Sequence, residues 1–131
     1  MELNKSLKCT VKKVVDGDTF DIELPNGLNH RIRLNGIDCP ESNQPAGWEA
    51  TAEARRILAK TDFEIFIVPR GTGKMSGRII ADIFPDADSA YNNDIEKSIN
   101  YELCTSGNAW HYQSETSNNA LIMNAQEIGR S

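Results

Sequence analysis

The chain has 131 residues, a mass of 14.6 kDa and a formal net charge of −5 at pH 7. Hydrophobic residues make up 39% of it and charged residues 25%, which is typical of a globular domain and excludes a disordered, coiled-coil or collagen-like chain. No apolar run reaches the roughly 18–20 residues that a membrane-spanning helix needs. We therefore expect a single domain over residues 1–131 and no membrane partner.

Alternating and β-branched residues predict three strands in the first part of the chain. The first covers residues 8–15 and ends at an Asp-Gly-Asp turn. The second covers residues 19–24, and residues 25–27 (Pro-Asn-Gly) form a hairpin turn to the third, over residues 29–37. Because side chains alternate along a strand, we expect one face of each strand to be buried. Phe20, Ile22 and Leu24 share one face of the second strand. In the third, Ile32, Leu34 and Gly36 face one way, and Arg31, Arg33 and Asn35 face the other.

The middle of the chain predicts a helix and two further strands. Ala50, Ala54, Ile57 and Leu58 recur at helical spacing after a loop over residues 39–45. Strands are expected over residues 63–68 and 78–84, with a mobile glycine-rich loop from Gly71 to Gly77 between them.

The last third predicts surface and helical structure. The acidic segment 85–94 is expected to be a surface excursion, and residues 119–128 a last helix. Ile99 and Leu103 indicate a short helix, with Asn100 as its N-cap and Gly107 just past its end. Five strands in the order β-β-β-α-β-β-α predict an α+β fold, a small OB-fold-like mixed β-barrel with packed helices.

The N-terminus and the cysteines bear on the compartment. The first ten residues contain Glu2 and no apolar segment, so they are no secretory signal as they stand. The protein is then cytoplasmic, or secreted if a leader has been removed. Cys9, Cys39 and Cys104 fit no zinc spacing, and an odd number fits no complete disulfide framework. We expect them to be buried free thiols.

The negative charge is unevenly distributed. Residues 81–131 hold eight acidic and two basic residues, whereas the first 80 residues are nearly balanced. A net charge of −5 argues against a nucleic-acid partner when taken alone. The distribution leaves room for a basic site in the first 80 residues.

Three segments carry charges that ordinary packing does not require. They contain Asp16, Asp18 and Asp21, then Arg31, Arg33, Asp38 and Glu41, then Arg78. Carboxylates supply the oxygen ligands that Ca²⁺ or Mg²⁺ prefers, and arginines supply planar forks that match phosphate oxygens. A further carboxylate can accept a proton from an attacking water. If the segments converge, they form a site for metal-assisted phosphodiester hydrolysis.

Each of these features also has an ordinary structural interpretation. An Asp-Gly-Asp sequence is usually just a turn, and it is no EF-hand loop here because Phe20 stands at the fifth position and no glycine follows. Alternate arginines on a strand usually form a solvated face. We expect His30 and His111 to be surface or hydrogen-bonded structural groups, since they complete no Ser-His-Asp arrangement.

An ordered set of motifs resembles the staphylococcal nuclease (thermonuclease) family. They are VDGDTF, RIRLNGIDCPE, G-x-E-A over residues 47–50, SGR and INYELCTSGNAW, which together cover roughly residues 8–112. The steps from Arg33 to Asp38 and from Asp38 to Glu41 match the family. The resemblance implies a five-stranded OB-like barrel with three helices. It also implies Ca²⁺-dependent endonuclease and exonuclease cleavage of DNA and RNA by a hydrolase that prefers single strands and leaves 3′-phosphate ends.

The resemblance also assigns roles residue by residue. Asp18 and Asp38 match the carboxylate ligands of Ca²⁺, and Cys39 matches a threonine whose backbone carbonyl completes the metal shell. Cys39 would thereby place a thiol beside the metal, where oxidation is a liability. Glu41 matches the general base. Arg33 and Arg78 match the arginines that hold the phosphate and stabilise the five-coordinate transition state, and Asp16 matches a nearby acidic position. We expect a monomer with DNA or RNA as its substrate.

The chain departs from the family pattern at three places. Ser76 replaces a tyrosine that helps to bind substrate, the acidic segment 85–94 is longer than usual and should point away from the site, and the C-terminal sequence lacks the usual ending. An alternative hypothesis is therefore a non-catalytic module that binds nucleic acid or a protein partner. A Ca²⁺-binding structural domain is a third, which requires the arginines to be incidental.

Overall fold

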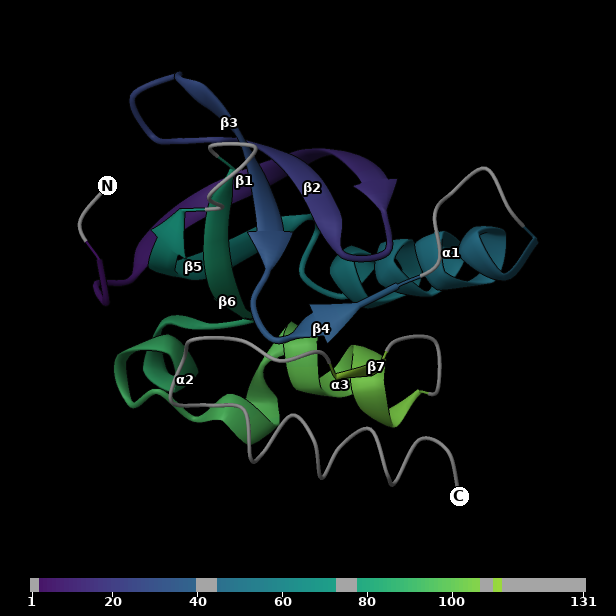
Figure 1. Ribbon diagram of the computed structural model, residues 1–131. Coiled ribbons are helices and arrows are strands. Elements are labelled where there is room, and N and C mark those ends of the chain that lie inside the picture. The colour runs from purple at the N-terminus through teal and green to yellow at the C-terminus, as the bar shows by residue number, and fades with distance from the viewer. Residues whose placement is uncertain (1–2, 40–44, 73–77, 107–109, 112–131) are drawn as a thin grey trace.

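Five strands form a closed barrel in the computed structural model, which describes residues 3–39, 45–72, 78–106 and 110–111. Around the barrel the order is β1-β2-β3-β6-β5 (Figure 1). The pairs are antiparallel except β3 with β6, which is parallel. The predicted mixed barrel is thus confirmed. The strands are β1 (Leu7–Asp16), β2 (Thr19–Glu23), β3 (Asn29–Leu34), β5 (Glu64–Thr72) and β6 (Ile79–Phe84).

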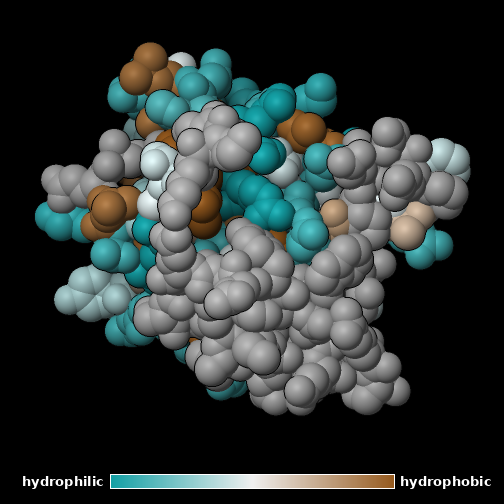
Figure 2. Space-filling model, in the orientation of Figure 1, coloured by the Kyte–Doolittle hydropathy of each residue, from teal (hydrophilic) through white to brown (hydrophobic). Residues whose placement is uncertain are grey.

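The barrel interior follows the predicted alternation of side chains. Phe20, Ile22, Ile32 and Leu34 are fully buried. The hairpin turn is also confirmed, because Gly27 adopts a φ of +85° that other residues rarely accept, and its N–H donates to the carbonyl of Leu24. Mostly hydrophilic residues lie across the middle of the barrel face that carries β2 and β3 (Figure 2).

One long helix covers the end of the barrel. This helix, α1 (Pro45–Ala59), buries the predicted apolar stripe of Ala50, Ala54, Ile57 and Leu58. Strand β5 extends through Gly71 and Thr72, so it includes the beginning of the loop predicted from Gly71 to Gly77.

The acidic segment 85–94 lies mostly at the surface, as predicted, but part of it is helical. It contains α2 (Ala87–Tyr91), whose first turn is capped by the Asp86 carboxylate accepting from the Ser89 N–H at 2.8 Å. Ser89 and Ala90 are buried, so this turn packs on the barrel instead of projecting from it. A 3₁₀ turn, η1 (Ile95–Lys97), follows.

Two short strands were also not predicted. β4 (Ile37–Asp38) pairs with β7 (Trp110–His111) in a separate antiparallel sheet, and each strand has only two residues, too few for a periodic signal. The predicted helix over residues 119–128 and the predicted helix end at Gly107 lie outside the described residues.

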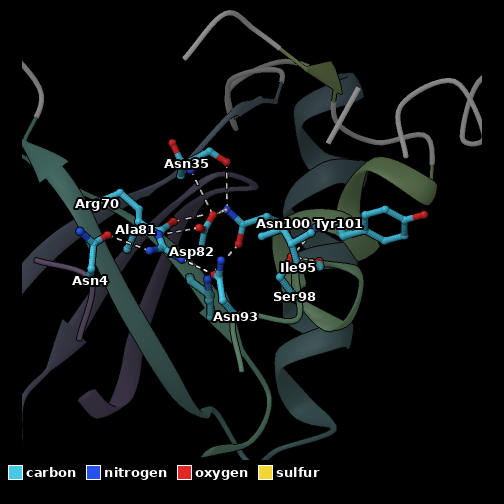
Figure 3. A network of polar contacts seen from close by, with 11 residues as sticks. Asn4, Asn35, Arg70, Ala81, Asp82, Asn93, Ile95, Ser98, Asn100 and Tyr101 are labelled. Atoms are coloured by element: carbon cyan, nitrogen blue, oxygen red, sulfur yellow. Dashed lines mark hydrogen bonds and ion pairs between the residues drawn. The ribbon is translucent and has the colours of Figure 1, made fainter. Parts of the chain in front are cut away.

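The helix α3 (Ile99–Thr105) is attached to the barrel by polar contacts (Figure 3). Its N-cap is Ser98, whose hydroxyl accepts from the Tyr101 N–H, and not Asn100 as predicted. Asn100 is the second residue of α3 and is fully buried. Its amide oxygen accepts from the Ile83 N–H at 2.9 Å, and its Nδ2 donates to the Asn35 carbonyl at 3.0 Å. The residue therefore joins α3 to both β6 and the end of β3.

Candidate active site

The turn between β1 and β2 presents Asp18 at the barrel surface. Asp18 is only 5% exposed. Gly17 precedes it in close contact with α1, since a Cβ on Gly17 would lie 3.0 Å from the Ala50 Cβ and 3.0 Å from the Cys39 Sγ. The turn is thus seated on the helix, and this close approach requires a glycine.

Arg33 brings the two predicted carboxylate ligands together. One guanidinium nitrogen of Arg33 lies 3.4 Å from Asp18 Oδ2 and 3.1 Å from Asp38 Oδ1. Asp18 comes from the turn before β2, Arg33 from β3 and Asp38 from β4. Their side chains converge on one side of the barrel, as the predicted site requires.

Hydrogen bonds hold the Asp18 carboxylate in place. Oδ2 accepts from the Cys39 N–H at 3.0 Å, and Oδ1 accepts from the Thr19 hydroxyl at 3.0 Å. Burial raises the pKa of the Asp18 carboxyl above its ordinary value, and the nearby Asp38 charge adds to this. Arg33 and the two donors oppose the rise. A further positive charge nearby would stabilise the ionised form of this buried carboxylate.

The Cys39 thiol points into the protein core. Its sulfur packs near Gly17 and Ala50, and the residue is 7% exposed. Burial raises the pKa of this thiol well above its ordinary value, and the Asp18 charge raises it further. A buried, protonated thiol is poorly reactive, so the oxidation risk that the sequence suggested is small. Cys9 and Cys104 are also buried free thiols, as predicted, and burial raises the pKa of each to about 12.

Arg78 lies just before β6, the strand that pairs with β3, at the level of Arg31. It directly precedes Ile79, which pairs in parallel with Ile32, the neighbour of Arg33. Arg78 is half-buried. Glu41, the predicted general base, and Ser76, the predicted departure from the family, lie outside the described residues.

Two of the predicted charged residues form a separate pair. Asp21 and Arg31 face each other on β2 and β3, and Arg31 Nε donates to Asp21 Oδ1 at 2.8 Å. A second bond joins the Arg31 guanidinium to Asp21 Oδ2 at 3.2 Å. Asp16 ends β1 opposite Thr19 and is half-buried.

The donor atoms of the cluster suit a hard cation. Asp18 and Asp38 offer carboxylate oxygens from two elements, and the Cys39 carbonyl would add a third oxygen, which is the chemistry that Ca²⁺ prefers. Within the described residues, no three His, Cys, Asp or Glu side chains gather as a metal site.

Sequence reasoning missed two residues that shape the cluster. Thr19 donates to Asp18 from the next position, and Gly17 allows the turn to approach α1. Nothing in the sequence pointed to a role at the site for either residue. Thr19 is an ordinary strand residue, and Gly17 is an ordinary turn residue.

The family model described as staphylococcal nuclease homologue matches residues 31–130. The match includes Arg33, Asp38, Glu41 and Arg78, while Asp18 precedes it. No helix in the described part of the chain is long and apolar enough to cross a membrane.

Three curated relatives are similar to this chain. A micrococcal nuclease of Shigella flexneri is 32% identical over 109 residues, which are 79% of this chain and 57% of that protein. The staphylococcal-like nuclease CAN1 of Arabidopsis thaliana is 30% identical over 94 residues, 72% of this chain and 25% of its own. An uncharacterized 38.1 kDa protein of Capnoides sempervirens is 29% identical over 106 residues, which are 77% of this chain and 28% of that protein. The chain thus spans between about a quarter and just over half of the length of these relatives.

Proposed function

Because this chain belongs to the staphylococcal nuclease family, we propose that it is a metal-dependent nuclease that hydrolyses phosphodiester bonds in DNA and RNA. The observation that carries the proposal is the convergence of Asp18, Arg33 and Asp38 from three separate elements on one side of the barrel. Two similar relatives also bear the name nuclease. We propose further that single strands are preferred, as the resemblance implies.

Arg33 and Arg78 hold the scissile phosphate in this proposal. A guanidinium can donate two parallel hydrogen bonds to phosphate oxygens, and its charge stabilises the extra negative charge of the five-coordinate transition state. Arg33 lies beside Asp18 and Asp38, so its guanidinium is at the proposed metal site. Phosphate carries no sequence, and the cleavage should therefore show weak sequence preference.

Asp18 and Asp38, with the Cys39 carbonyl, would hold Ca²⁺. The bound cation would supply positive charge to a phosphate oxygen and to the attacking water. Glu41 accepts the proton of that water as general base. The water oxygen forms the new bond to phosphorus while the bond to the 5′-oxygen breaks and that oxygen takes a proton from solvent, which leaves a 3′-phosphate and a 5′-hydroxyl end.

The proposal is tested by the digestion of a short single-stranded oligonucleotide with Ca²⁺ or with EDTA, followed by analysis of the product ends. We expect 3′-phosphate products with Ca²⁺ and none with EDTA. Equal turnover under both conditions would refute the metal role. Binding without cleavage at high protein concentration would instead favour the non-catalytic module.

A further inference from the structure

A groove between β1 and α1 lies outside the candidate active site. It encloses about 490 Å³ and is lined by Lys13, Val14 and Val15 from β1 and by Trp48, Thr51 and Arg55 from α1. A smaller hollow of about 240 Å³ shares Lys13, Val14 and Arg55 with it and reaches Phe63. The two elements pack together at one end of the barrel (Figure 1).

The helix presents this surface as one stripe. Trp48, Thr51 and Arg55 stand at positions i, i+3 and i+7 of α1, which share a face of a helix. The apolar residues that hold α1 on the barrel occupy the other face. Trp48 and Arg55 are therefore not needed for the packing of the helix.

The groove combines positive charge with an exposed aromatic ring. Trp48 is 63% exposed, and Lys13 and Arg55 are exposed as well. Within the described chain, no ion pair engages Lys13 or Arg55, whereas the adjacent Lys12 pairs with Glu23. The groove thus places two cations beside a large exposed aromatic ring on a chain with a net charge of −5, although Lys13 also acts electrostatically on Asp21 across the strand pair.

A buried hydroxyl adds a second observation. Thr51 lies in the stripe between Trp48 and Arg55 and is 5% exposed. Its Oγ1 has no hydrogen-bond partner, which is true of no other buried side-chain nitrogen or oxygen in the described residues. Buried hydroxyls are normally hydrogen-bonded, so this one stands out in the lining of the groove.

The groove adjoins the candidate active site through α1. Ala50, next to Thr51, contacts Gly17, and Gly17 is covalently joined to Asp18. On the barrel, Lys13 of β1 lies opposite Asp21 of β2 in the strand register. The turn that carries Asp18 thus contacts the helix that lines the groove.

We propose that the groove between β1 and α1 is a second binding site for the same single-stranded nucleic acid, in which Lys13 and Arg55 contact backbone phosphates and a base stacks on Trp48. Sequence-tolerant proteins of this kind bind single strands with a basic groove and aromatic side chains. The inference rests on the proposed function. An acidic peptide would use the two cations but would gain much less from an exposed indole.

The test measures the affinity for a fluorescent oligothymidylate of about 12 nucleotides, within the site sizes of OB folds, by anisotropy in EDTA, where no cleavage is expected. Trp48→Ala should weaken binding roughly 5- to 100-fold, as expected for one stacked base, and Trp48→Phe should restore much of it. Arg55→Ala should reduce the slope of log affinity against log salt by about 0.7.

Matched controls remove the same groups elsewhere. Tyr91→Ala deletes an aromatic ring that is 86% exposed on α2, and Lys97→Ala deletes an exposed cation of η1. Neither should change the affinity. The inference is overturned if the groove variants bind like the wild type, if the controls lose as much, if the wild type does not bind, or if polyglutamate competes as well as the oligonucleotide.

A dinucleotide substrate separates this inference from the proposed function. It is too short to reach both sites, so the groove variants should hydrolyse it at the wild-type rate with Ca²⁺. Binding that depends on Trp48 without any hydrolysis would refute the nuclease proposal and support the groove. If substitutions of Trp48 and Arg55 do not change the hydrolysis of either long or short strands, the nuclease proposal is supported and the groove site is refuted.

Discussion

Arg33 is the residue on which the candidate site depends. It contacts both Asp18 and Asp38 and is largely buried between them, whereas Arg31, two residues earlier on β3, is exposed and paired with Asp21. The two arginines have the same charge and lie on the same strand. They therefore form a matched pair for mutation.

We predict that Arg33→Ala lowers the rate of oligonucleotide hydrolysis by roughly 10²–10³-fold, the usual cost of losing one preorganised donor to a transition state. Arg33→Lys should also be impaired, because an ammonium group cannot bridge two phosphate oxygens. Arg31→Ala should stay within a few-fold of the wild type. Similar losses for Arg31→Ala and Arg33→Ala in steady-state kinetics would show that the phosphate does not lie at Arg33.

Gly17 lies in close contact with Ala50 and Cys39. We predict that Gly17→Ala lowers the free energy of unfolding by about 1–3 kcal/mol, because the new methyl group would overlap Ala50 and Cys39. Gly71→Ala is the control, since nothing lies within 4 Å of its Cβ position. Urea unfolding measures both variants. A Gly17→Ala variant as stable as Gly71→Ala would contradict the close packing of the turn on α1.

At the scale of elements, the apolar parts of the fold were predictable and the polar connections were not. Strand alternation identified Phe20 and Ile32 as inward residues because each strand has one buried face. The same rule placed Asn35 on the exposed face, yet it is fully buried, and its side chain donates to Asp82 at 3.2 Å. Periodicity cannot find such residues, since a polar side chain becomes buried only when a distant partner satisfies it.

The Asn100 network is the polar connection with the largest expected effect on stability. Asn100→Ala would remove the buried hydrogen bonds that the side chain makes to the Ile83 N–H and to the Asn35 carbonyl. We predict a loss of roughly 2–4 kcal/mol in the free energy of unfolding, the cost of losing buried hydrogen bonds of this kind. Asn92→Ala, at an exposed site that ends α2, should cost less than about 0.5 kcal/mol. Chemical denaturation of both variants would decide, and equal losses would refute the anchoring role of Asn100.

The cap of α2 gives a pH dependence. The N–H and the hydroxyl of Ser89 hold the pKa of the Asp86 carboxyl below its ordinary value. The stabilisation is therefore present above the unfolded-state pKa of about 3.9 and is lost as the pH falls through the lower folded pKa. Asp86→Ala should lower the free energy of unfolding by about 1 kcal/mol at pH 7, as for other N-caps, and by less at pH 3. Asp88→Ala is the exposed control, and a pH-independent difference would contradict the cap.

At the scale of the whole molecule, the candidate site exists only because the barrel closes. Asp18 comes from the turn before β2, Arg33 from β3 and Asp38 from β4, and these segments meet only in the closed barrel. The motifs identified these residues through resemblance to a family, and their spacing alone did not show which carboxylates would meet. Asp21 looked equivalent to Asp18 in the sequence, but the register pairs it with Arg31.

A site that forms only in the folded barrel should couple cation binding to folding. We predict that Ca²⁺ raises the melting temperature, because a ligand at about 100 times its Kd adds roughly 2.7 kcal/mol to the stability of the state that binds it. The shift should saturate and should reverse with EDTA. Asp38→Asn should abolish it, since a neutral amide at this half-exposed position weakens the cation's hold.

The control for this experiment is Asp21→Asn, which removes one negative charge from the same barrel face without touching the cluster. Its melting temperature should still rise with Ca²⁺ as in the wild type. A general response to ionic strength would instead raise the melting temperatures of the wild type, Asp38→Asn and Asp21→Asn alike. Mg²⁺ or high NaCl would then give the same increase. A Ca²⁺ shift that survives in Asp38→Asn but disappears in Asp21→Asn would place the cation beside Arg31, away from the scissile phosphate proposed at Arg33.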